Sequence, residues 1–464
     1  MDLNFLAELK NIVGPKYVMD AQEDRICYSF DATFRDYLPD VIVKPGTAEE
    51  IQAVVRLAAE KGVPVYTRGA GTGLSGGSVP VNGGIVLVTT RLNKILAIDT
   101  VNYTAAVESG VITQDFCNAV DAAGLYYPPD PGSIKTSTLG GNIAECAGGP
   151  HCIKYGVTRD YILGMEVVMP DGSLVQVGNS IDGEMSGPDW PMLLCGSEGT
   201  LGIVTKMTLR LIDKPPAKQT MLAIFDAIDE AAVTVSTMMA SGTIPTTLEI
   251  MDNLTICAVE NYLHIGLPVD ADALLLIEVD GEPTAVAKQA ESVIKVCSDC
   301  GAREVKIAKD QKEADSFGLA RRSISPACGK INPTKISEDA TVPRSQIPAM
   351  VRAVRELAAK YKLKMVIFGH AGDGNLHPNI LSNKRDHEEM ERVEEAICEL
   401  FQIALKLGGT LSGEHGIGYM KAPFLQWEFG KTGFVAGRNI KAAVDPNGIL
   451  NPGKLFDSKF YQEE

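Results

Sequence analysis

The chain has 464 residues, of which 45% are hydrophobic and 22% charged, a composition typical of a globular enzyme with two or three domains. Its formal net charge of −16 argues against nucleic acid or an anionic membrane as a partner, because an acidic surface repels both. The N-terminus lacks a basic stretch followed by an apolar core, and no run approaches the roughly 18 apolar residues of a membrane span. We therefore expect a cytoplasmic protein whose ten scattered cysteines are reduced thiols.

The first 215 residues predict an α+β domain. Strand-like runs rich in β-branched residues occur at DVIVKP, VPVYTR, GGIVLVT, KILAID and YTAAVESG. A helical pattern, TAEEIQAVVRLAAEKG, lies between the first two, with Thr47 as its N-cap and Gly62 as its stop. A proline-rich break, DKPPAK at Asp213 to Lys218, indicates the end of this domain.

Three glycine-rich loops interrupt this domain. The first, Tyr66 to Gly77, contains a GxGxxG pattern, which in a Rossmann fold opens a helix. Further glycines and a proline follow it here, so we expect no helix and the Rossmann interpretation fails. The other two loops are Asp130 to Gly149 and Gly196 to Thr205. Each alone is readily an ordinary turn, but together they offer backbone N–H groups to a long, phosphate-containing cofactor.

Alternating helices and strands are expected after the break, including a helix at 386–407 whose acidic residues form a solvated face. Cys297 and Cys300 form a CxxC at the end of a helical stretch. Because no second pair accompanies them, they are a weak signal for a metal or redox site.

Two short glycine-flanked loops contain three of the six histidines. The runs KMVIF and LHPNIL predict two strands joined by a turn, so His370 and His377 would face each other, with Asn379 on the same face as His377. Glu414 would complete a set of divalent-metal ligands and leave His415 as a base. Each histidine alone is as readily a hydrogen-bonded core residue, but the cluster points to an enzyme.

Six motifs carry a family resemblance, in the order RGAGTGLSGG, PPDPGSIKTSTLGGNIAECAGG, CGSEGTLGIVT, GHAGDGNLH, SGEHGIG and DPNGILNPGK. They resemble the FAD-dependent D-2-hydroxyacid dehydrogenases of the vanillyl-alcohol-oxidase (PCMH-type FAD-binding) superfamily, over nearly the whole chain. The resemblance implies an α+β fold with a two-subdomain FAD-binding domain over 1–215 (core about 37–215) and a substrate-capping domain over 216–420 that carries the metal and catalytic loops. It also implies a C-terminal segment, 421–464, packed on the FAD-binding domain.

The resemblance further assigns residues to FAD. The first loop would hold the pyrophosphate, the second would line the flavin and its phosphates, and the third would lie near the adenine and isoalloxazine. These residues are, loop by loop, Arg68, Gly69, Ala70, Gly71, Thr72, Gly73 and Leu74; Pro131, Gly132, Ser133, Thr138, Gly140, Gly141 and Asn142; and Glu198, Gly202, Ile203 and Val204. The first loop lacks the histidine that tethers FAD in some superfamily members, so we expect non-covalent FAD. Cys146 stands where the family commonly has Asn.

By the same resemblance, the divalent metal is bound by His370, His377 and Glu414, and His415 is the catalytic base. Zn²⁺ is the first expectation by ligand type, although Fe²⁺ and Mn²⁺ accept similar ligands. Asn379 would touch the substrate, and Arg321 with Lys335 would hold its carboxylate, with Arg322 as the alternative to Arg321.

The expected reaction is the oxidation of a small D-2-hydroxy acid, D-lactate to pyruvate, by hydride transfer to flavin N5. The sequence has no cysteine cluster for an iron–sulfur centre, so the electrons must leave for an external acceptor, and a soluble electron-transferring flavoprotein is the expected partner. Glycolate or D-2-hydroxyglutarate with another acceptor is an alternative. Two other classes stay open, a metal-dependent hydrolase and a flavin subunit that mainly docks a redox partner.

Overall fold

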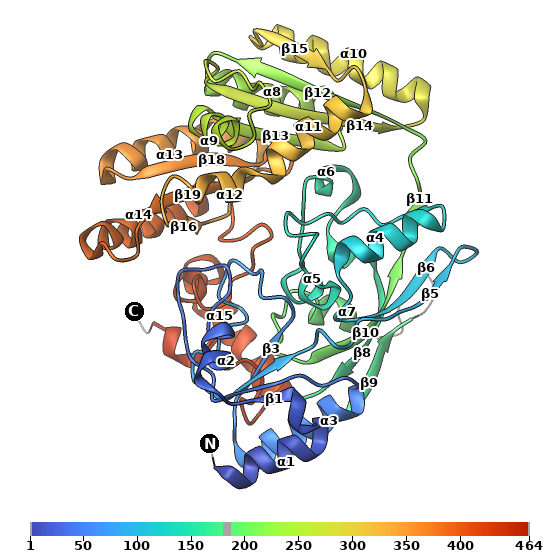
Figure 1. Ribbon diagram of the computed structural model, residues 1–464. Coiled ribbons are helices and arrows are strands. Elements are labelled where there is room, and N and C mark those ends of the chain that lie inside the picture. Colours follow the sequence, from blue (N-terminus) through green and yellow to red (C-terminus); the bar gives the residue numbers. More distant parts are fainter. Residues whose placement is uncertain (1, 180–186, 463–464) are drawn as a thin grey trace. The chain divides into compact units, whose positions relative to one another are not determined.

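The computed structural model of the protein describes residues 2–179 and 187–462 and divides the chain into two compact units (Figure 1). The first unit consists of Met1–Ala147, Val157–Lys214 and Glu414–Glu464, and the second of Gly148–Gly156 and Pro215–Gly413. The division at Lys214 lies inside the DKPPAK break. No feature of the sequence indicated that the short stretch Gly148–Gly156 joins the second unit.

A four-stranded sheet with the order β1-β2-β4-β3 forms one part of the first unit. Its strands β2, β3 and β4 are parallel, and side chains of helix α3 pack with them in one core. The Thr47 hydroxyl caps α3 by accepting a hydrogen bond from the backbone N–H of Glu50 at 3.2 Å, and Gly62 ends the helix at φ 66°, as predicted. The elements are α1 (Leu3–Val13), β1 (Val18–Met19), α2 (Gln22–Cys27), β2 (Val41–Val43), α3 (Ala48–Lys61), β3 (Val65–Arg68) and β4 (Ile85–Val88).

A five-stranded antiparallel sheet with the order β5-β6-β10-β8-β9 forms the other part of this unit. Strand β10 buries every second side chain against a core shared with helices α4, α5 and α7. The five strand-like runs expected in this region all form strands. The elements are β5 (Ile95–Asp99), β6 (Thr104–Glu108), α4 (Thr113–Ala122), β7 (Leu125–Tyr126), α5 (Leu139–Glu145), β8 (Ile162–Val168), β9 (Leu174–Gly178), α7 (Trp190–Leu194), β10 (Ile203–Arg210) and β11 (Ile212–Asp213).

The C-terminal part of the chain returns to the first unit and covers the edge of its parallel sheet. The Val65 N–H donates to the Ile449 carbonyl at 2.9 Å, and the Asn451 N–H donates to the Val65 carbonyl at 2.8 Å. Leu450, between them, is fully buried in the core of that sheet. Helix α15 (Leu425–Val444), which is interrupted at Gly430, precedes this contact.

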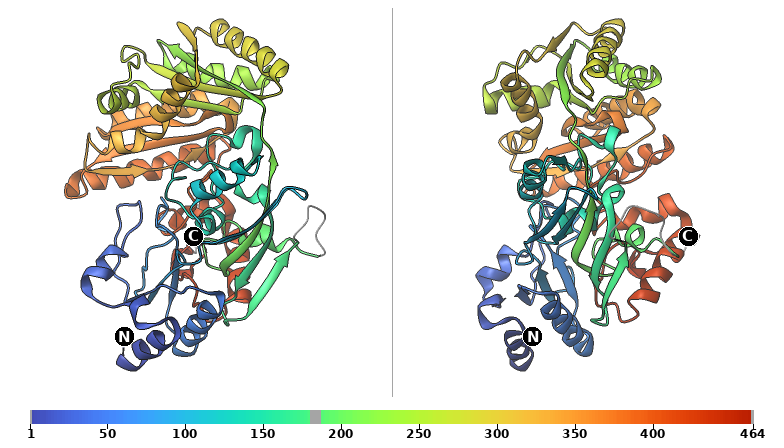
Figure 2. Two further views of the ribbon diagram at one scale, coloured as in Figure 1. Left: turned by 45° about the vertical axis from the view of Figure 1, so that its right-hand side comes forward. Right: turned by 90° about the vertical axis from the view of Figure 1, so that its right-hand side faces the viewer.

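An eight-stranded sheet with the path β15-β12-β14-β13-β18-β19-β16 forms the second unit, and β17 pairs with β19 beside this path. Side chains of both alternating sets are buried along β13, β18 and β19, so both faces of the sheet are covered, and helices lie on either side of it (Figure 2). The strands are β12 (Ala217–Phe225), β13 (Thr247–Asp252), β14 (Ala273–Gly281), β15 (Glu304–Ile307), β16 (Thr334–Ser337), β17 (Ala340–Thr341), β18 (Lys364–His370) and β19 (Asn375–Ser382).

The helices of the second unit form two packed groups. Helices α10, α8, α13 and α14 contact one another in that order, whereas α9, α11 and α12 form a second group that packs with Phe368 and Leu381 of the sheet. The acidic helix expected at 386–407 is α14, capped by Asp386. The helices are α6 (Cys152–Tyr155), α8 (Ile228–Ala240), α9 (Asn253–Leu263), α10 (Pro283–Asp299), α11 (Gln311–Arg322), α12 (Ile324–Cys328), α13 (Ile347–Tyr361) and α14 (His387–Lys406).

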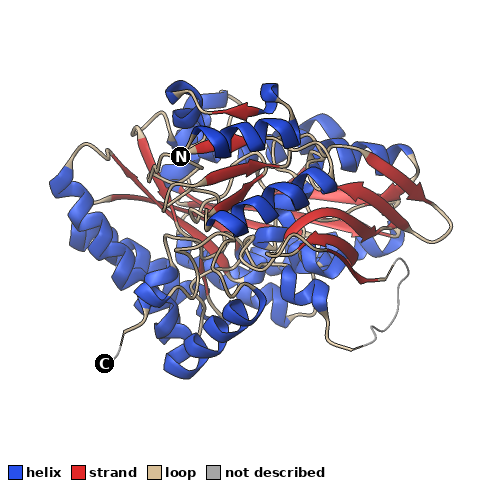
Figure 3. Ribbon diagram, turned by 90° about the horizontal axis from the view of Figure 1, so that it is seen from below, coloured by secondary structure: helices blue, strands red, loops and turns tan. Residues whose placement is uncertain are grey.

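The expected α+β class is confirmed, since both units combine sheets with helices (Figure 3). Among the described helices, none has both the length and the apolar character needed to cross a membrane.

Candidate active site

Strands β18 and β19 form the predicted hairpin, joined by a 3-10 turn at Ala371–Asp373 and by Gly374 at φ 82°. The register pairs Phe368 with His377 and His370 with Asn375, so His370 and His377 are diagonal neighbours on one face of the sheet. Their ring centroids lie 4.9 Å apart at an interplanar angle of 89°. The two imidazoles are therefore positioned to reach one ion.

Glu249 on β13 lies opposite His370 in the sheet and has no exposed surface. One carboxylate oxygen lies 2.5 Å from His370 Nδ1, and the other accepts a hydrogen bond from Arg321 Nε. Burial raises the pKa of Glu249, but the charges of Arg321 and His370 and their hydrogen bonds outweigh it and lower that pKa to about 2. Glu249 is thus a buried carboxylate that orients two candidate site residues, and the sequence analysis missed it. The buried strand sequence TLEIMD contains two acidic residues, Glu249 and Asp252, and nothing local distinguishes Glu249 as part of the site.

Two cations belong to this face of the sheet, and one of them, Arg321, contacts the Glu249 carboxylate. Arg321 is in the last turn of α11, with its guanidinium 5.1 Å from the centroid of the Phe368 ring, whereas its neighbour Arg322 is exposed. Lys335 on β16 lies opposite Leu381 of β19, which puts Lys335 on the same face as His377. Burial lowers the pKa of Lys335 to about 8, and the nearby Arg321 charge adds to that effect. The face therefore carries a positive potential that suits an anion.

Asn379 is fully buried two residues beyond His377 on the same face of β19. Its Nδ2 donates to the His377 carbonyl at 2.9 Å, while its Oδ1 has no hydrogen-bond partner among the described residues. A buried amide oxygen without a partner is costly unless a ligand supplies a donor. Of the predicted residues, the structure thus brings together Arg321, Lys335, His370, His377 and Asn379 on one sheet face.

Glu414 directly follows Gly413, where the chain leaves the second unit. One ligand atom from each of His370, His377 and Glu414 lies within 4.8 Å of the other two. Two imidazoles and a carboxylate are donors that fit Zn²⁺, Fe²⁺ or Mn²⁺. A Cβ on Gly413 would lie 2.2 Å from Thr341 Oγ1, so only glycine permits the chain to pass there. The group suits a metal, and its ligation stays a prediction.

His415 lies in the loop that follows, within the first unit. A Cβ on Gly416, at φ 80°, would lie 1.9 Å from Glu145 Oε2, which explains a glycine beside the predicted base. The Glu198 carboxylate holds this loop by accepting hydrogen bonds from the backbone N–H groups of Ile417 at 2.7 Å and Gly418 at 2.6 Å. Burial raises the pKa of Glu198 to about 6 against those hydrogen bonds.

The first glycine-rich loop fits a pyrophosphate. Within the described residues, none of the backbone N–H groups of Gly71 to Gly77 donates a hydrogen bond to the protein, and the buried Ser75 hydroxyl has no partner. Unpaired, partly buried N–H groups in a loop with positive φ at Gly71 and Gly76 are typical of an anion nest. No helix follows the loop, which confirms that the Rossmann interpretation fails.

The other residues assigned to FAD all belong to the first unit. A Cβ on Gly69 would lie 2.2 Å from Thr138 Oγ1, so the first and second loops are in contact. Thr138 caps α5, and the Asn142 amide donates to Thr113 Oγ1 at 2.8 Å. The Arg68 guanidinium donates to the Phe30 carbonyl at 2.6 Å. Of the rest, Ala70, Thr72, Gly73 and Leu74 lie in the first loop, Pro131, Gly132 and Ser133 in the second, Gly140 and Gly141 in α5, Gly202 just before β10, and Ile203 and Val204 at its start.

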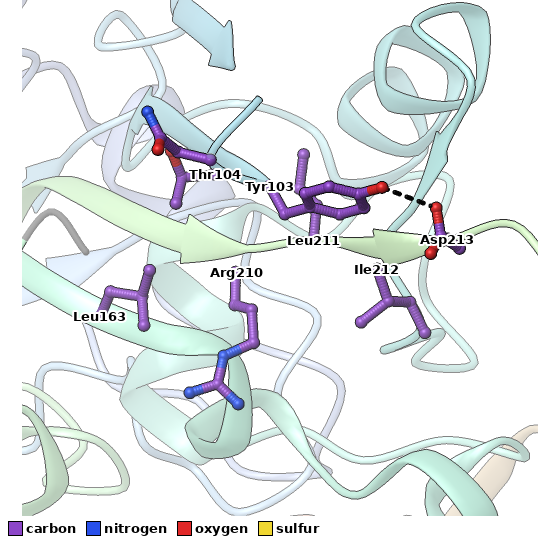
Figure 4. Close-up of a pocket in the computed structure, with 8 residues that line it drawn as sticks. Tyr103, Thr104, Leu163, Arg210, Leu211, Ile212 and Asp213 are labelled. Carbon is purple, nitrogen blue, oxygen red and sulfur yellow. Dashed lines mark hydrogen bonds between the residues drawn. The ribbon is translucent and has the colours of Figure 1, made fainter. Parts of the chain in front are cut away.

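A separate pocket of about 300 Å³ lies at the end of β10 (Figure 4). The Tyr103 hydroxyl donates to Asp213 at 2.9 Å on one side of it, and the Arg210 side chain extends on the other. None of its lining residues is a predicted site residue.

Two families account for most of the chain. The C-terminal domain of FAD linked oxidases matches residues 214–455, and an FAD binding domain matches residues 39–178. The chain belongs to the FAD-linked oxidase family. The glycolate oxidase subunit GlcD of Bacillus subtilis (strain 168) is 47% identical to this FAD-linked oxidase over 97% of the chain and 96% of the relative. The D-lactate dehydrogenase of Archaeoglobus fulgidus is 36% identical over 98% of the chain and 99% of the relative.

The solved structure of p-cresol methylhydroxylase with substrate bound resembles this FAD-linked oxidase at a TM-score of 0.84, with coverage of 99% of this chain and 97% of that chain. At 18% identity this likeness concerns the fold alone, and it supports the expected α+β fold with an FAD-binding domain. An FAD-binding domain is confirmed, while the metal and the roles of individual residues stay predictions.

Proposed function

We propose that this FAD-linked oxidase oxidises a small 2-hydroxy acid to the 2-oxo acid and passes the electrons to an external acceptor. The observation that carries the proposal is the placement of Arg321 and Lys335 on the same sheet face as the His370 and His377 pair. The face combines an anion-binding part with a cluster suited to a metal, as a 2-hydroxy carboxylate requires. The identities to a glycolate oxidase subunit and a D-lactate dehydrogenase support this class of substrate.

Arg321 and Lys335 would hold the substrate carboxylate. Arg321 uses its Nε for Glu249, and its terminal nitrogens would pair with the substrate carboxylate. Lys335 adds a second positive charge. Asn379 Oδ1 would accept a hydrogen bond from the substrate hydroxyl, consistent with its buried and unpartnered position.

The same residues prepare the hydroxyl for oxidation. A divalent ion bound by His370, His377 and Glu414 would stabilise negative charge on the substrate oxygen. His415 would accept the hydroxyl proton as a general base. FAD in the first unit would supply the hydride acceptor. The Glu249 carboxylate keeps the His370 ring oriented, as carboxylates do for metal-bound histidines.

We propose D-lactate as the substrate and pyruvate as the product. Glycolate is the second candidate, because the glycolate oxidase subunit is the more similar of the two relatives, at 47% against 36% identity. A soluble electron-transferring flavoprotein is the proposed acceptor. A metal-dependent hydrolase would leave the FAD-binding domain without a role.

Anaerobic reduction of the bound flavin, followed by absorbance near the flavin maximum, tests the proposal. D-lactate, L-lactate, glycolate and D-2-hydroxyglutarate are compared at equal concentrations. We expect D-lactate or glycolate to bleach the flavin fastest. Faster bleaching by L-lactate or D-2-hydroxyglutarate would overturn the substrate, and no bleaching by any of the four would overturn the class. Reoxidation by electron-transferring flavoprotein, a quinone analogue, cytochrome c or oxygen then identifies the acceptor.

A further inference from the structure

Two cysteines of the first unit are held side by side at the ends of two helices. Cys146 caps the C-terminus of α5 in a left-handed conformation at φ 52°, and Cys195 caps the C-terminus of α7. The Gly196 N–H donates to the Ile143 carbonyl at 2.9 Å, which ties the residue after Cys195 to the last turn of α5. A Cβ built on Gly196 would lie 3.6 Å from Cys146 Cβ. Backbone contacts between the two segments therefore hold Cys146 and Cys195 close together.

The Cys146 sulfur faces a cation and a second thiol. Arg159 Nε donates a hydrogen bond to Cys146 Sγ at 3.1 Å, and the Cys195 side chain lies close enough to act on the pKa of Cys146. Both cysteines keep only 6% of their surface exposed, whereas Arg159, which contacts Cys146, is exposed. A cation and a second thiol facing one sulfur are the surroundings in which cysteines become nucleophiles.

The pKa values of the two thiols are shifted in opposite directions. The hydrogen bond from Cys195 and then the guanidinium of Arg159 lower the pKa of Cys146 to about 6, against the effect of burial. The same hydrogen bond, with burial, raises the pKa of Cys195. Cys117 in the same unit offers a contrast, because burial raises its pKa to about 12 although it is less buried by surface area than Cys146. The surroundings therefore favour the thiolate at Cys146 and the thiol at Cys195.

We propose that Cys146 and Cys195 form a peroxide-reactive dithiol, with Cys146 as the attacking and Cys195 as the resolving cysteine. The Cys146 thiolate attacks hydrogen peroxide, the O–O bond breaks, and Cys146 becomes a sulfenic acid with release of hydroxide. The Cys195 thiol then attacks that sulfur, a disulfide forms, and the sulfenic oxygen leaves as water. The two cysteines lose two electrons in total, and peroxide gains them.

The proposed disulfide would join two segments that the family resemblance assigns to FAD. Cys146 follows the helix that contains Gly140, Gly141 and Asn142, and Cys195 precedes the third glycine-rich loop. The site does not depend on the identity of the substrate. It requires the cysteine at position 146, where the resembled family commonly has asparagine.

The test is a short exposure of the FAD-loaded protein to stoichiometric hydrogen peroxide at pH 7, followed by alkylation, digestion and mass spectrometry. We expect a peptide pair linked through Cys146 and Cys195 to appear before any oxidation of Cys117. In Cys195→Ser, dimedone should label Cys146 as the sulfenic acid, and no linked pair should form. The Arg159→Met variant should form the disulfide about tenfold more slowly, since less Cys146 is thiolate at pH 7.

Oxidation of Cys117 ahead of Cys146 in the unmodified chain would overturn the proposal, because reactivity would then follow access alone. So would an unlinked Cys146 that oxidises equally in the unmodified chain and in Cys195→Ser. The decisive comparison uses the unmodified chain, so it does not depend on the folding of a variant.

Discussion

Glu249 and Arg321 form a buried ion pair on the sheet face that carries the candidate site, and the other oxygen of Glu249 lies 2.5 Å from His370. One carboxylate thus links the residue proposed to bind the substrate with a residue proposed to bind the metal. Breaking a buried pair leaves a charge unpaired in the interior, which is costly. A buried pair therefore fixes the positions of its side chains more firmly than a surface pair does.

Glu249→Gln should weaken both functions at once. The amide keeps the size of the side chain but removes the charge and replaces one acceptor oxygen with an NH2 donor, so His370 and Arg321 can no longer both donate to it. We expect metal affinity to fall about 10- to 100-fold, the usual cost of losing a carboxylate that orients a metal ligand, together with a higher KM. Metal titration and steady-state kinetics measure the two effects.

Glu278→Gln is the matched control for Glu249→Gln. Glu278 is also a strand glutamate paired with a cation, Lys218, but that lysine is half exposed. Surface pairs contribute about 1 kcal/mol or less, so this variant should retain metal and KM. Equal losses in both variants would show that Glu249 acts on stability alone.

Lys335 should make substrate binding weaker at high pH. Its ammonium form binds the carboxylate, and burial lowers its pKa to about 8, so the charge is present below that pH and lost above it. We expect kcat/KM to fall as pH rises through about 8, because this ratio reports the free enzyme. Lys335→Arg should move the decline to higher pH. An unchanged decline in Lys335→Arg would assign it to another group.

Removal of the metal should abolish turnover without removing the flavin. After chelation we expect the flavin spectrum to persist and activity to return with Zn²⁺, Fe²⁺ or Mn²⁺. His377→Ala should lose metal and activity, whereas His387→Ala, at the start of α14 and exposed, should keep both. Full turnover by metal-free protein would refute the metal assignment.

His415→Asn should separate the base from the ligands. This variant should retain FAD and metal but slow flavin reduction by substrate about 10²- to 10⁴-fold, the range for losing a general base. Single-turnover reduction in a stopped-flow instrument measures this step directly. A variant that reduces its flavin at the original rate would exclude His415 as the base.

The flavin should be released by acid. The loop from Tyr66 to Gly77 contains no histidine, so precipitation with acid should leave colourless protein and free FAD in the supernatant. A yellow pellet would show a covalent bond.

Local patterns in the sequence were enough to predict much of this fold. Two strand-like runs joined by a glycine-rich turn predicted the β18 and β19 hairpin, and Thr47 and Gly62 marked the ends of α3. Contacts over long sequence separations were not predictable in this way. Glu249 meets His370 across 121 positions, and a single glutamate in a strand has no local signature.

The membership of Gly148–Gly156 in the second unit has a similar cause. Lys154 Nζ donates to the Asp280 carbonyl at 2.7 Å and pairs with the Asp280 carboxylate, and the Tyr155 hydroxyl donates to that carboxylate at 2.9 Å. The glycine-rich sequence around this stretch indicated only a loop, because its partner lies about 125 positions away.

The return of the chain to β3 determines when the flavin-binding unit can be finished during synthesis. Val65 cannot form its backbone hydrogen bonds until Ile449 and Asn451 have been synthesised. Lys454, whose Nζ donates to the Gly77 carbonyl at 2.7 Å, is synthesised after them. At roughly 5–20 residues per second, the ribosome needs roughly 10–50 s to make the stretch between the DKPPAK break and these partners. During that interval the edge of the parallel sheet is open to other strands. We therefore expect FAD to bind after translation. Slower synthesis at low temperature should not raise the fraction of FAD-loaded protein unless FAD is abundant when the C-terminal segment docks.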